Sequence, residues 1–128
     1  MKPVLIDTSV WIEFLKGNPD YFPPMIALMK DGEIFSLELI FAELLQGVKT
    51  TRELNLITDF YRQLKILDQP GLVFESGDFS RRAGLINRGI GLIDAVIFHT
   101  ADKFDLQIWT LDMKIISFLG DRRVYQPK

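Results

Sequence analysis

The sequence predicts an α/β fold built on a central parallel sheet with helices on both faces. Residues 3–6 form a short, continuous apolar run, which suits the centre of a parallel sheet because both of its faces are covered. The next segment, residues 8–15, has apolar side chains at helical spacing, which predicts a helix that ends before Gly17, Asn18 and Pro19. The same alternation of strand and helix recurs along the chain, which favours parallel strands joined by right-handed crossovers.

The remaining elements are assigned from apolar periodicity and from Gly, Pro and capping residues. Further strands are expected at residues 33–37, 65–68 and 106–110, with an edge strand at 123–125. Further helices are expected at residues 21–30, 38–48, 51–64, 72–88, 92–104 and 112–119. Gly77 and Gly84 interrupt the expected helix at 72–88, because glycine has a low helix propensity. No repeat or linker divides the chain, so residues 1–128 are expected to form a single domain.

The composition restricts the kind of metal site that the protein could contain. The chain is 48% hydrophobic and 25% charged, as in ordinary globular proteins. It has no cysteine and a single histidine, His99, which excludes thiolate and multi-histidine zinc sites. A bound metal would therefore have oxygen ligands, which favours Mg²⁺ or Mn²⁺.

Charge and hydropathy bear on location and partners. No apolar run approaches the roughly 20 residues needed to cross a bilayer, and no signal peptide is recognised, so a cytoplasmic protein without a membrane partner is expected. A net charge of -2 weighs against a protein that simply coats phosphates. It weighs less against an enzyme whose own acids surround a metal ion, because a bound cation reverses the local field.

The first candidate site residues follow the first expected strand. Asp7, Thr8 and Ser9 lie at its carboxyl end, which is the edge where open α/β sheets bind ligands. Alternatively, Asp7 or Thr8 only caps the helix that begins there, since both residue types bond to free backbone amides.

Three further carboxylates occupy comparable positions. Glu43 lies in a largely apolar helical segment, where an unpaired charge needs a cation, a proton or a route to water. Asp94 is in the first turn of a helix, where it could serve the helix dipole alone, and Asp112 could be an N-cap. With Asp7, these acids are expected early in helices or at strand ends, so that all four could converge at one end of the sheet. Such a cluster requires a cation, and metals held this way serve mainly phosphate chemistry.

Four segments of the sequence resemble the four acidic motifs of PIN-domain ribonucleases, in particular the VapC toxins of prokaryotic toxin-antitoxin pairs. The segments are residues 6–11, 42–48, 92–97 and 110–112, which contain Asp7, Glu43, Asp94 and Asp112. They occur in the family's order and with similar spacing. The resemblance extends from residue 4 to about residue 118.

The resemblance implies a three-layer α/β/α fold and a Mg²⁺-dependent endoribonuclease that cleaves RNA phosphodiester bonds through metal-activated water. It also implies a homodimer that a cognate antitoxin inhibits. By position, Asp7, Glu43, Asp94 and Asp112 would bind the metal, and Thr8 or Ser9 would be the hydroxyl that supports the site.

The chain departs from the family pattern at three positions. Ile40 stands where many members have a hydroxyl, and Lys114 stands where some have a further acid. His99 replaces a residue that is commonly small, and we expect it to be a packing or surface residue rather than a general base.

Two other functions remain open. One is an aspartyl-nucleophile phosphatase, although such enzymes usually have an acid two residues after the nucleophile, where this chain has Ser9. The other is a non-catalytic PIN-like binding module, which would have no reason to keep four clustered acids.

Aromatic residues are abundant in the first and middle helices, and one core of this size is not expected to bury all of them. They are Trp11, Phe14, Tyr21, Phe22, Phe60 and Tyr61. Some are therefore expected to face a partner, in a symmetric dimer whose acidic sites share a groove bordered by Arg81, Arg82 and Arg88.

Overall fold

The central sheet has four strands, all parallel, in the order β3-β2-β1-β4. In this computed structural model, which describes residues 3–127, the strands are β1 (Val4–Ile6), β2 (Ile34–Ser36), β3 (Lys65–Ile66) and β4 (Gln107–Trp109). β1 is central, and its Leu5 is paired with residues of β2 and β4. The predicted parallel sheet is thus confirmed.

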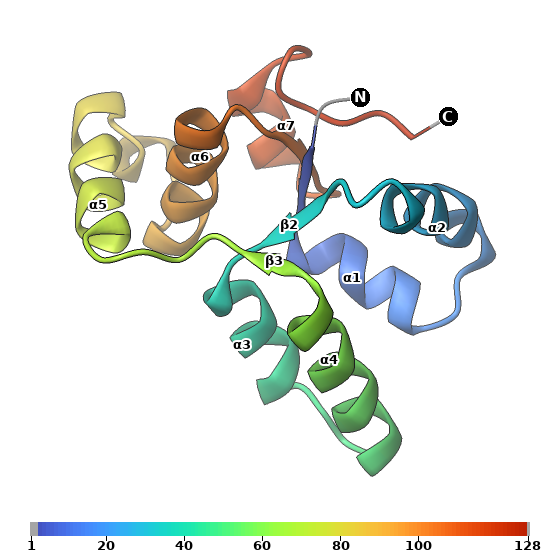
Figure 1. The fold of residues 1–128 in the computed structure, drawn as a ribbon. Helices are drawn as coiled ribbons and strands as arrows, with labels where there is room; N and C mark the ends of the chain where they lie inside the picture. The colour runs from blue at the N-terminus through green and yellow to red at the C-terminus, as the bar shows by residue number, and fades with distance from the viewer. Residues whose placement is uncertain (1–2, 128) are drawn as a thin grey trace.

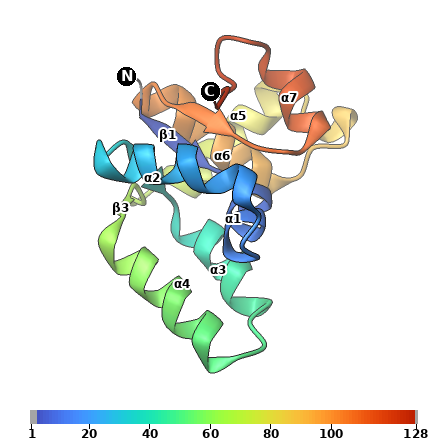
Figure 2. The same ribbon diagram turned by 90° about the vertical axis from the view of Figure 1, so that its right-hand side faces the viewer.

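Helices cover both faces of this sheet. They are α1 (Thr8–Leu15), α2 (Phe22–Lys30), α3 (Glu38–Gln46), α4 (Thr51–Gln63), α5 (Leu72–Ala83), α6 (Leu92–Phe104) and α7 (Met113–Leu119), with short 3-10 helices η1 (Pro19–Tyr21) and η2 (Ile86–Arg88). In Figure 1, α1 and α2 lie to one side of the sheet and α5 and α6 to the other. The pair α3 and α4 extends away from the sheet, as Figure 2 also shows. The three-layer α/β/α arrangement agrees with the expected fold.

The apolar run at the start of the chain lies at the centre of the core. All three residues of β1 are fully buried, because helices cover the sheet on both sides. The carboxyl end of β1 leads directly into α1, so Asp7 joins the sheet to the helix, and Thr8 and Ser9 lie in its first turn.

Four aromatic residues of α1, α3 and α4 form one cluster around Trp11. The indole of Trp11 contacts the rings of Phe14, Phe41 and Phe60 at centroid distances of 6.0, 5.3 and 5.5 Å. Trp11 and Phe14 are buried, whereas Phe22 is 41% exposed. The expectation that one core would not bury all six aromatic residues is confirmed, because Phe22 is exposed while α1, α3 and α4 enclose Trp11 and Phe14. That an exposed ring faces a partner stays a prediction.

Two expected elements end differently in the structure. The helix expected at 72–88 ends at Ala83, because Gly84 adopts a left-handed conformation with φ +64°, and η2 follows as a separate turn. Gly77 remains inside α5. The expected edge strand at 123–125 is reduced to one parallel bridge between Val124 and Ile108 of β4.

Within residues 3–127, no helix combines the length and the apolar character needed to cross a membrane.

Candidate functional site

The four predicted acids lie on four different elements. Asp7 occupies the N-cap position of α1, immediately after β1, and is 7% exposed. Asp94 lies in the first turn of α6, and Asp112 is the N-cap of α7. Glu43 lies past the middle of α3, so the expectation that it is early in its helix is wrong.

The charges of these acids act on one another. Burial, and after it the negative charges of Asp7, Asp112 and Glu43 in that order, raise the pKa of Asp94 from its ordinary 3.8 to about 6. The ammonium of Lys114 acts in the opposite direction. Three acids that are distant in sequence therefore lie near enough to Asp94 to disfavour its ionised form, as like charges do.

Asp7 is held by two hydroxyl groups on one of its oxygens. Ser9 Oγ and Thr110 Oγ1 donate hydrogen bonds to Asp7 Oδ2 at 2.9 and 2.8 Å. The hydroxyl of Ser9 accepts from the backbone N–H of Leu111 at 3.0 Å, and that of Thr110 accepts from the N–H of Asp112 at 3.0 Å. Because backbone amides can only donate, they fix both hydroxyls as donors to Asp7. Within the described residues, Oδ1 of Asp7 has no hydrogen bond.

A third hydroxyl positions Glu43. Thr8 Oγ1 donates to Glu43 Oε1 at 2.8 Å, which joins the start of α1 to α3. Glu43 also borders a cavity of ≈ 380 Å³ between α1, α3 and α4. The sequence left open whether Thr8 or Ser9 supports the site; in the structure each supports a different acid.

Thr110 is the site residue that the sequence analysis missed. It is buried and links Asp7 to the backbone of Asp112. Its position at the end of β4, two residues before an acid, is the signal that could have indicated it.

The alternative that the acids only cap helices is confirmed for Asp112 and wrong for Asp7. Asp7 is at an N-cap position, but its carboxylate makes no capping bond to the amides of α1. Asp112 Oδ1 does accept from the N–H of Lys114, at 2.9 Å, and caps α7. The helix dipole stabilises the ionised form of Asp94 less than burial and the neighbouring charges destabilise it. The pKa of Asp94 is therefore raised.

The chemistry of these side chains fits a divalent cation with oxygen ligands. Asp7, Glu43, Asp94 and Asp112 are all carboxylates, and their repulsion at Asp94 is of the kind that a bound cation relieves. Across residues 3–127, no three acids or histidines are gathered tightly enough to hold one ion as they stand. The fit therefore rests on charge and donor type.

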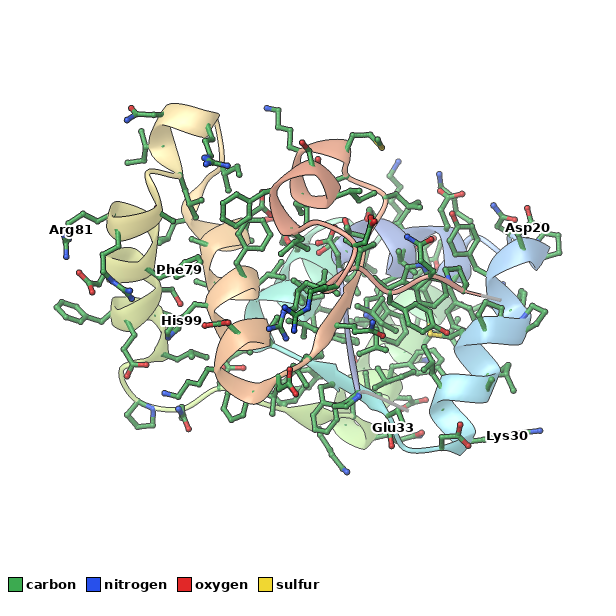
Figure 3. All side chains as sticks on the ribbon, turned by 90° about the horizontal axis from the view of Figure 1, so that it is seen from above. Asp20, Lys30, Glu33, Phe79, Arg81 and His99 are labelled. Atoms are coloured by element: carbon green, nitrogen blue, oxygen red, sulfur yellow. The ribbon has the colours of Figure 1, made fainter. Side chains whose placement is uncertain are left out.

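His99 lies on the face of α6 that packs against α5. Its Nε2 is 3.2 Å from Glu75 Oε1, and its ring is 5.8 Å from that of Phe79. Phe79 and His99 lie next to each other in Figure 3, while Arg81 projects outward. The contacts agree with the packing or surface role expected for this histidine.

The family assignment follows from sequence similarity over almost the whole chain. Residues 4–118 match the family model of the PIN domain. The chain belongs to the PIN-domain family. This PIN domain is 30% identical over 118 residues to ribonuclease VapC19 of Mycobacterium tuberculosis (strain CDC 1551 / Oshkosh), which covers 91% of this chain and 94% of that protein. It is also 30% identical over 112 residues to ribonuclease VapC10 of the same strain, covering 86% and 83% of the two chains.

Solved structures show the same fold. The PIN domain superposes with a TM-score of 0.72 and 21% identity on a chain of VapBC2 from Rickettsia felis bound to a promoter DNA fragment, covering 95% of this chain and 96% of that one. A toxin-antitoxin complex from Klebsiella pneumoniae gives a TM-score of 0.70 at 19% identity and covers 98% of each chain. The predicted resemblance to VapC-type PIN domains is therefore confirmed.

Proposed function

We propose that this PIN domain is a Mg²⁺-dependent endoribonuclease and the toxin of a toxin-antitoxin pair. The observation that carries the proposal is the set of hydrogen bonds that joins three motif acids: Thr110 links Asp7 to the backbone of Asp112, and Thr8, next to Asp7, holds Glu43. The charges of these three acids also raise the pKa of Asp94. Its relatives VapC19 and VapC10 are named ribonucleases. Family membership and the acidic site support the same activity.

Asp7, Glu43, Asp94 and Asp112 would hold Mg²⁺ or Mn²⁺. When bound, such an ion supplies an activated water and neutralises the charge that develops at the scissile phosphate. The protein's own hydroxyls orient the carboxylates: Ser9 and Thr110 donate to Oδ2 of Asp7, and Thr8 donates to Glu43. Among the described residues, Oδ1 of Asp7 has no hydrogen bond and is left for a cation. The low exposure of Asp7 limits its contact with water.

The partners proposed are an RNA substrate, a cognate antitoxin and a second copy of the chain, in the cytoplasm. The structural neighbours include toxin-antitoxin complexes, which supports an antitoxin partner. Large apolar side chains are available for contacts between proteins, since Phe74 is 85% and Ile86 83% exposed. The basic border proposed for the dimer groove is reduced to Arg88, because Asp78 binds both Arg81 and Arg82.

Cleavage of RNA by the purified protein in Mg²⁺ and in EDTA tests the proposal. We expect cleavage only with the metal, products with 3'-hydroxyl and 5'-phosphate ends, and no cleavage by Asp7→Asn. Cleavage by Asp7→Asn at the wild-type rate would show that the site is wrong. Hydrolysis of small phosphate esters would instead favour the phosphatase, and RNA binding without cleavage would favour the binding module.

A further inference from the structure

A second hollow lies beside the acidic site, between η2 and α7. Its volume is ≈ 390 Å³, and it is lined by Arg88, Ile90, Met113, Lys114, Ser117 and Phe118. Two of these residues directly follow Asp112 in the chain. The hollow therefore begins where the acidic site ends.

Lys114 connects the hollow to the acids. Its backbone N–H donates to Asp112 Oδ1 at 2.9 Å, which fixes the start of the Lys114 side chain beside one of the acids. The ammonium lies over Gly89, 3.7 Å from where a β-carbon would be, and Gly89 adopts φ +73°. The turn after η2 thus leaves space for this side chain.

Arg88 is held by aromatic stacking rather than by an acid. Its guanidinium lies 5.2 Å from the ring centroid of Phe118. Phe118 is stacked on Phe98 at 4.8 Å with an interplanar angle of 17°, and Phe98 is 3% exposed. The cation is therefore supported from the core, which reduces the ordering needed when a ligand binds.

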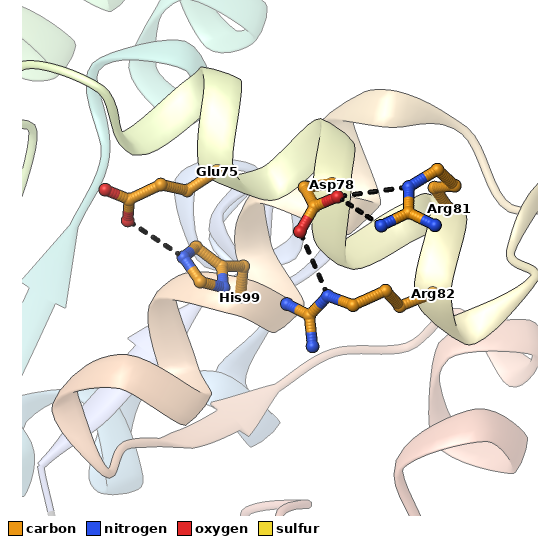
Figure 4. Close-up of polar contacts among 5 residues, drawn as sticks. All are labelled: Glu75, Asp78, Arg81, Arg82 and His99. Carbon is orange, nitrogen blue, oxygen red and sulfur yellow. Dashed lines mark hydrogen bonds and ion pairs between the residues drawn. The ribbon is translucent and has the colours of Figure 1, made fainter.

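These two cations differ from the basic residues of α5. Arg81 and Arg82 each bind Asp78, at 2.7 and 3.1 Å (Figure 4). Among the residues that the structure describes, neither Arg88 nor Lys114 forms an ion pair. Their charges are thus available to an anionic ligand.

We propose that this hollow binds one nucleotide of the RNA strand, adjacent to the nucleotide that is cleaved. Arg88 and Lys114 contact its phosphate, and the side chain of Met113, which is 71% exposed, packs against its nucleoside. The inference rests on the proposed ribonuclease function. It also explains how a chain of net charge -2 holds a polyanion near four carboxylates, since the cations are placed beside them.

The test is the salt dependence of RNA binding in EDTA, measured by the anisotropy of a short fluorescein-labelled single-stranded RNA. Each lost phosphate contact reduces the slope of log K against log salt by about 0.7 for a single strand. We expect this reduction for Arg88→Gln and for Lys114→Gln, so a fourfold rise in salt should weaken their binding about 2.6-fold less than it weakens the wild type. Arg88→Lys should restore the slope.

Two further variants separate phosphate contact from other effects. Met113→Ser should weaken binding severalfold without changing the slope, because it removes an apolar contact. Arg81→Gln is the matched control and should leave both quantities unchanged, since Asp78 already binds this guanidinium. Thermal melting of each variant verifies that it is folded.

Wild-type slopes for both Arg88→Gln and Lys114→Gln would overturn the inference, as would an equal effect of Arg81→Gln. Cleavage of RNA by the wild type in Mg²⁺ is assayed separately. Cation-dependent binding without cleavage would contradict the proposed function and leave the nucleotide site standing. If the wild type cleaves RNA but the variants bind with the wild-type slope, the proposed function stands and the nucleotide site is contradicted. Absence of RNA binding would contradict both.

Discussion

Carboxylates in two regions of the molecule have pKa values shifted in opposite directions. In the acidic site, burial and three like charges raise the pKa of Asp94 to about 6. On α5, the hydrogen bonds from Lys103 and His99 lower the pKa of Glu75, and those from Arg81 and Arg82 lower the pKa of Asp78. The residue type is nearly the same, so the surroundings decide the shift.

The two regions differ in whether basic groups balance the charge of the carboxylates. On α5 they do, and in the acidic site they do not. Lys103 Nζ is 2.9 Å from Glu75 Oε1, and Asp78 receives two guanidinium groups (Figure 4). Asp94 has one cation nearby, Lys114, against three acids. Stability alone does not favour such an excess of negative charge in a partly buried place, whereas binding of a cation does.

The largest expected effect is on activity. Asp94→Asn should reduce RNA cleavage in Mg²⁺ by roughly 100-fold or more, because it removes one carboxylate from a site worth several kcal/mol at the transition state. The same variant should melt at a higher temperature than the wild type in EDTA at pH 7, since it relieves repulsion. Asp78→Asn is the control, and it should cleave RNA normally. Equal loss in both variants would remove the distinction between the two regions.

Metal binding should reverse the repulsion. A ligand that binds only the native state at about 100 times its Kd stabilises the protein by about 2.7 kcal/mol. We therefore expect Mn²⁺ to raise the melting temperature of the wild type relative to EDTA, and to raise that of Asp94→Asn much less. An unchanged melting temperature at millimolar Mn²⁺ would count against the acidic site as a metal site.

The hydroxyl that holds Asp7 should contribute measurably to stability. Thr110→Val leaves the buried Asp7 Oδ2 without one of its donors, which should cost about 1–3 kcal/mol in urea unfolding. Thr100→Val is a matched control, because Thr100 Oγ1 is buried without a hydrogen-bond partner in the structure, and this variant should not destabilise. Thr110→Ser should recover most of the loss. Equal costs for the two valine variants would assign the effect to packing.

The smallest expected effect is the dependence of stability on pH without metal. The folded-state pKa of Asp94 lies above its ordinary 3.8, so the native protein binds this proton more tightly than the unfolded chain does. Stability from this group is therefore greatest below about pH 4 and is lost as the pH rises through about 6. Glu75 and Asp78 have lowered pKa values and act with the opposite sign, losing stability as the pH falls.

Melting curves in EDTA at a series of pH values measure this dependence. Relative to Asp94→Asn, the wild type should become progressively less stable between about pH 4 and pH 6. Relative to Asp78→Asn, it should become more stable as the carboxylate of Asp78 ionises. Parallel curves for the wild type and Asp94→Asn would show that Asp94 is not coupled to its neighbours.

The sequence alone determined the elements and the acids. The apolar run of β1 and the helix α6 are local features, because apolar periodicity acts within a few residues. The end of α5 was missed because either Gly77 or Gly84 could have broken the helix, and only Gly84 takes the left-handed conformation.

Only the tertiary structure decided which groups the acids contact. The bond from Thr110 to Asp7 spans 103 residues, and that from Thr8 to Glu43 spans 35. Both bonds depend on β1 lying between β2 and β4. These three strands are far apart in the sequence, so local patterns do not predict the contacts. Packing also decided that Asp112 caps a helix while Asp7 accepts hydroxyl groups instead, although both occupy N-cap positions. Hydrogen bonds and charge repulsion depend on distances in space, and distances between residues far apart in sequence are fixed only in the folded chain.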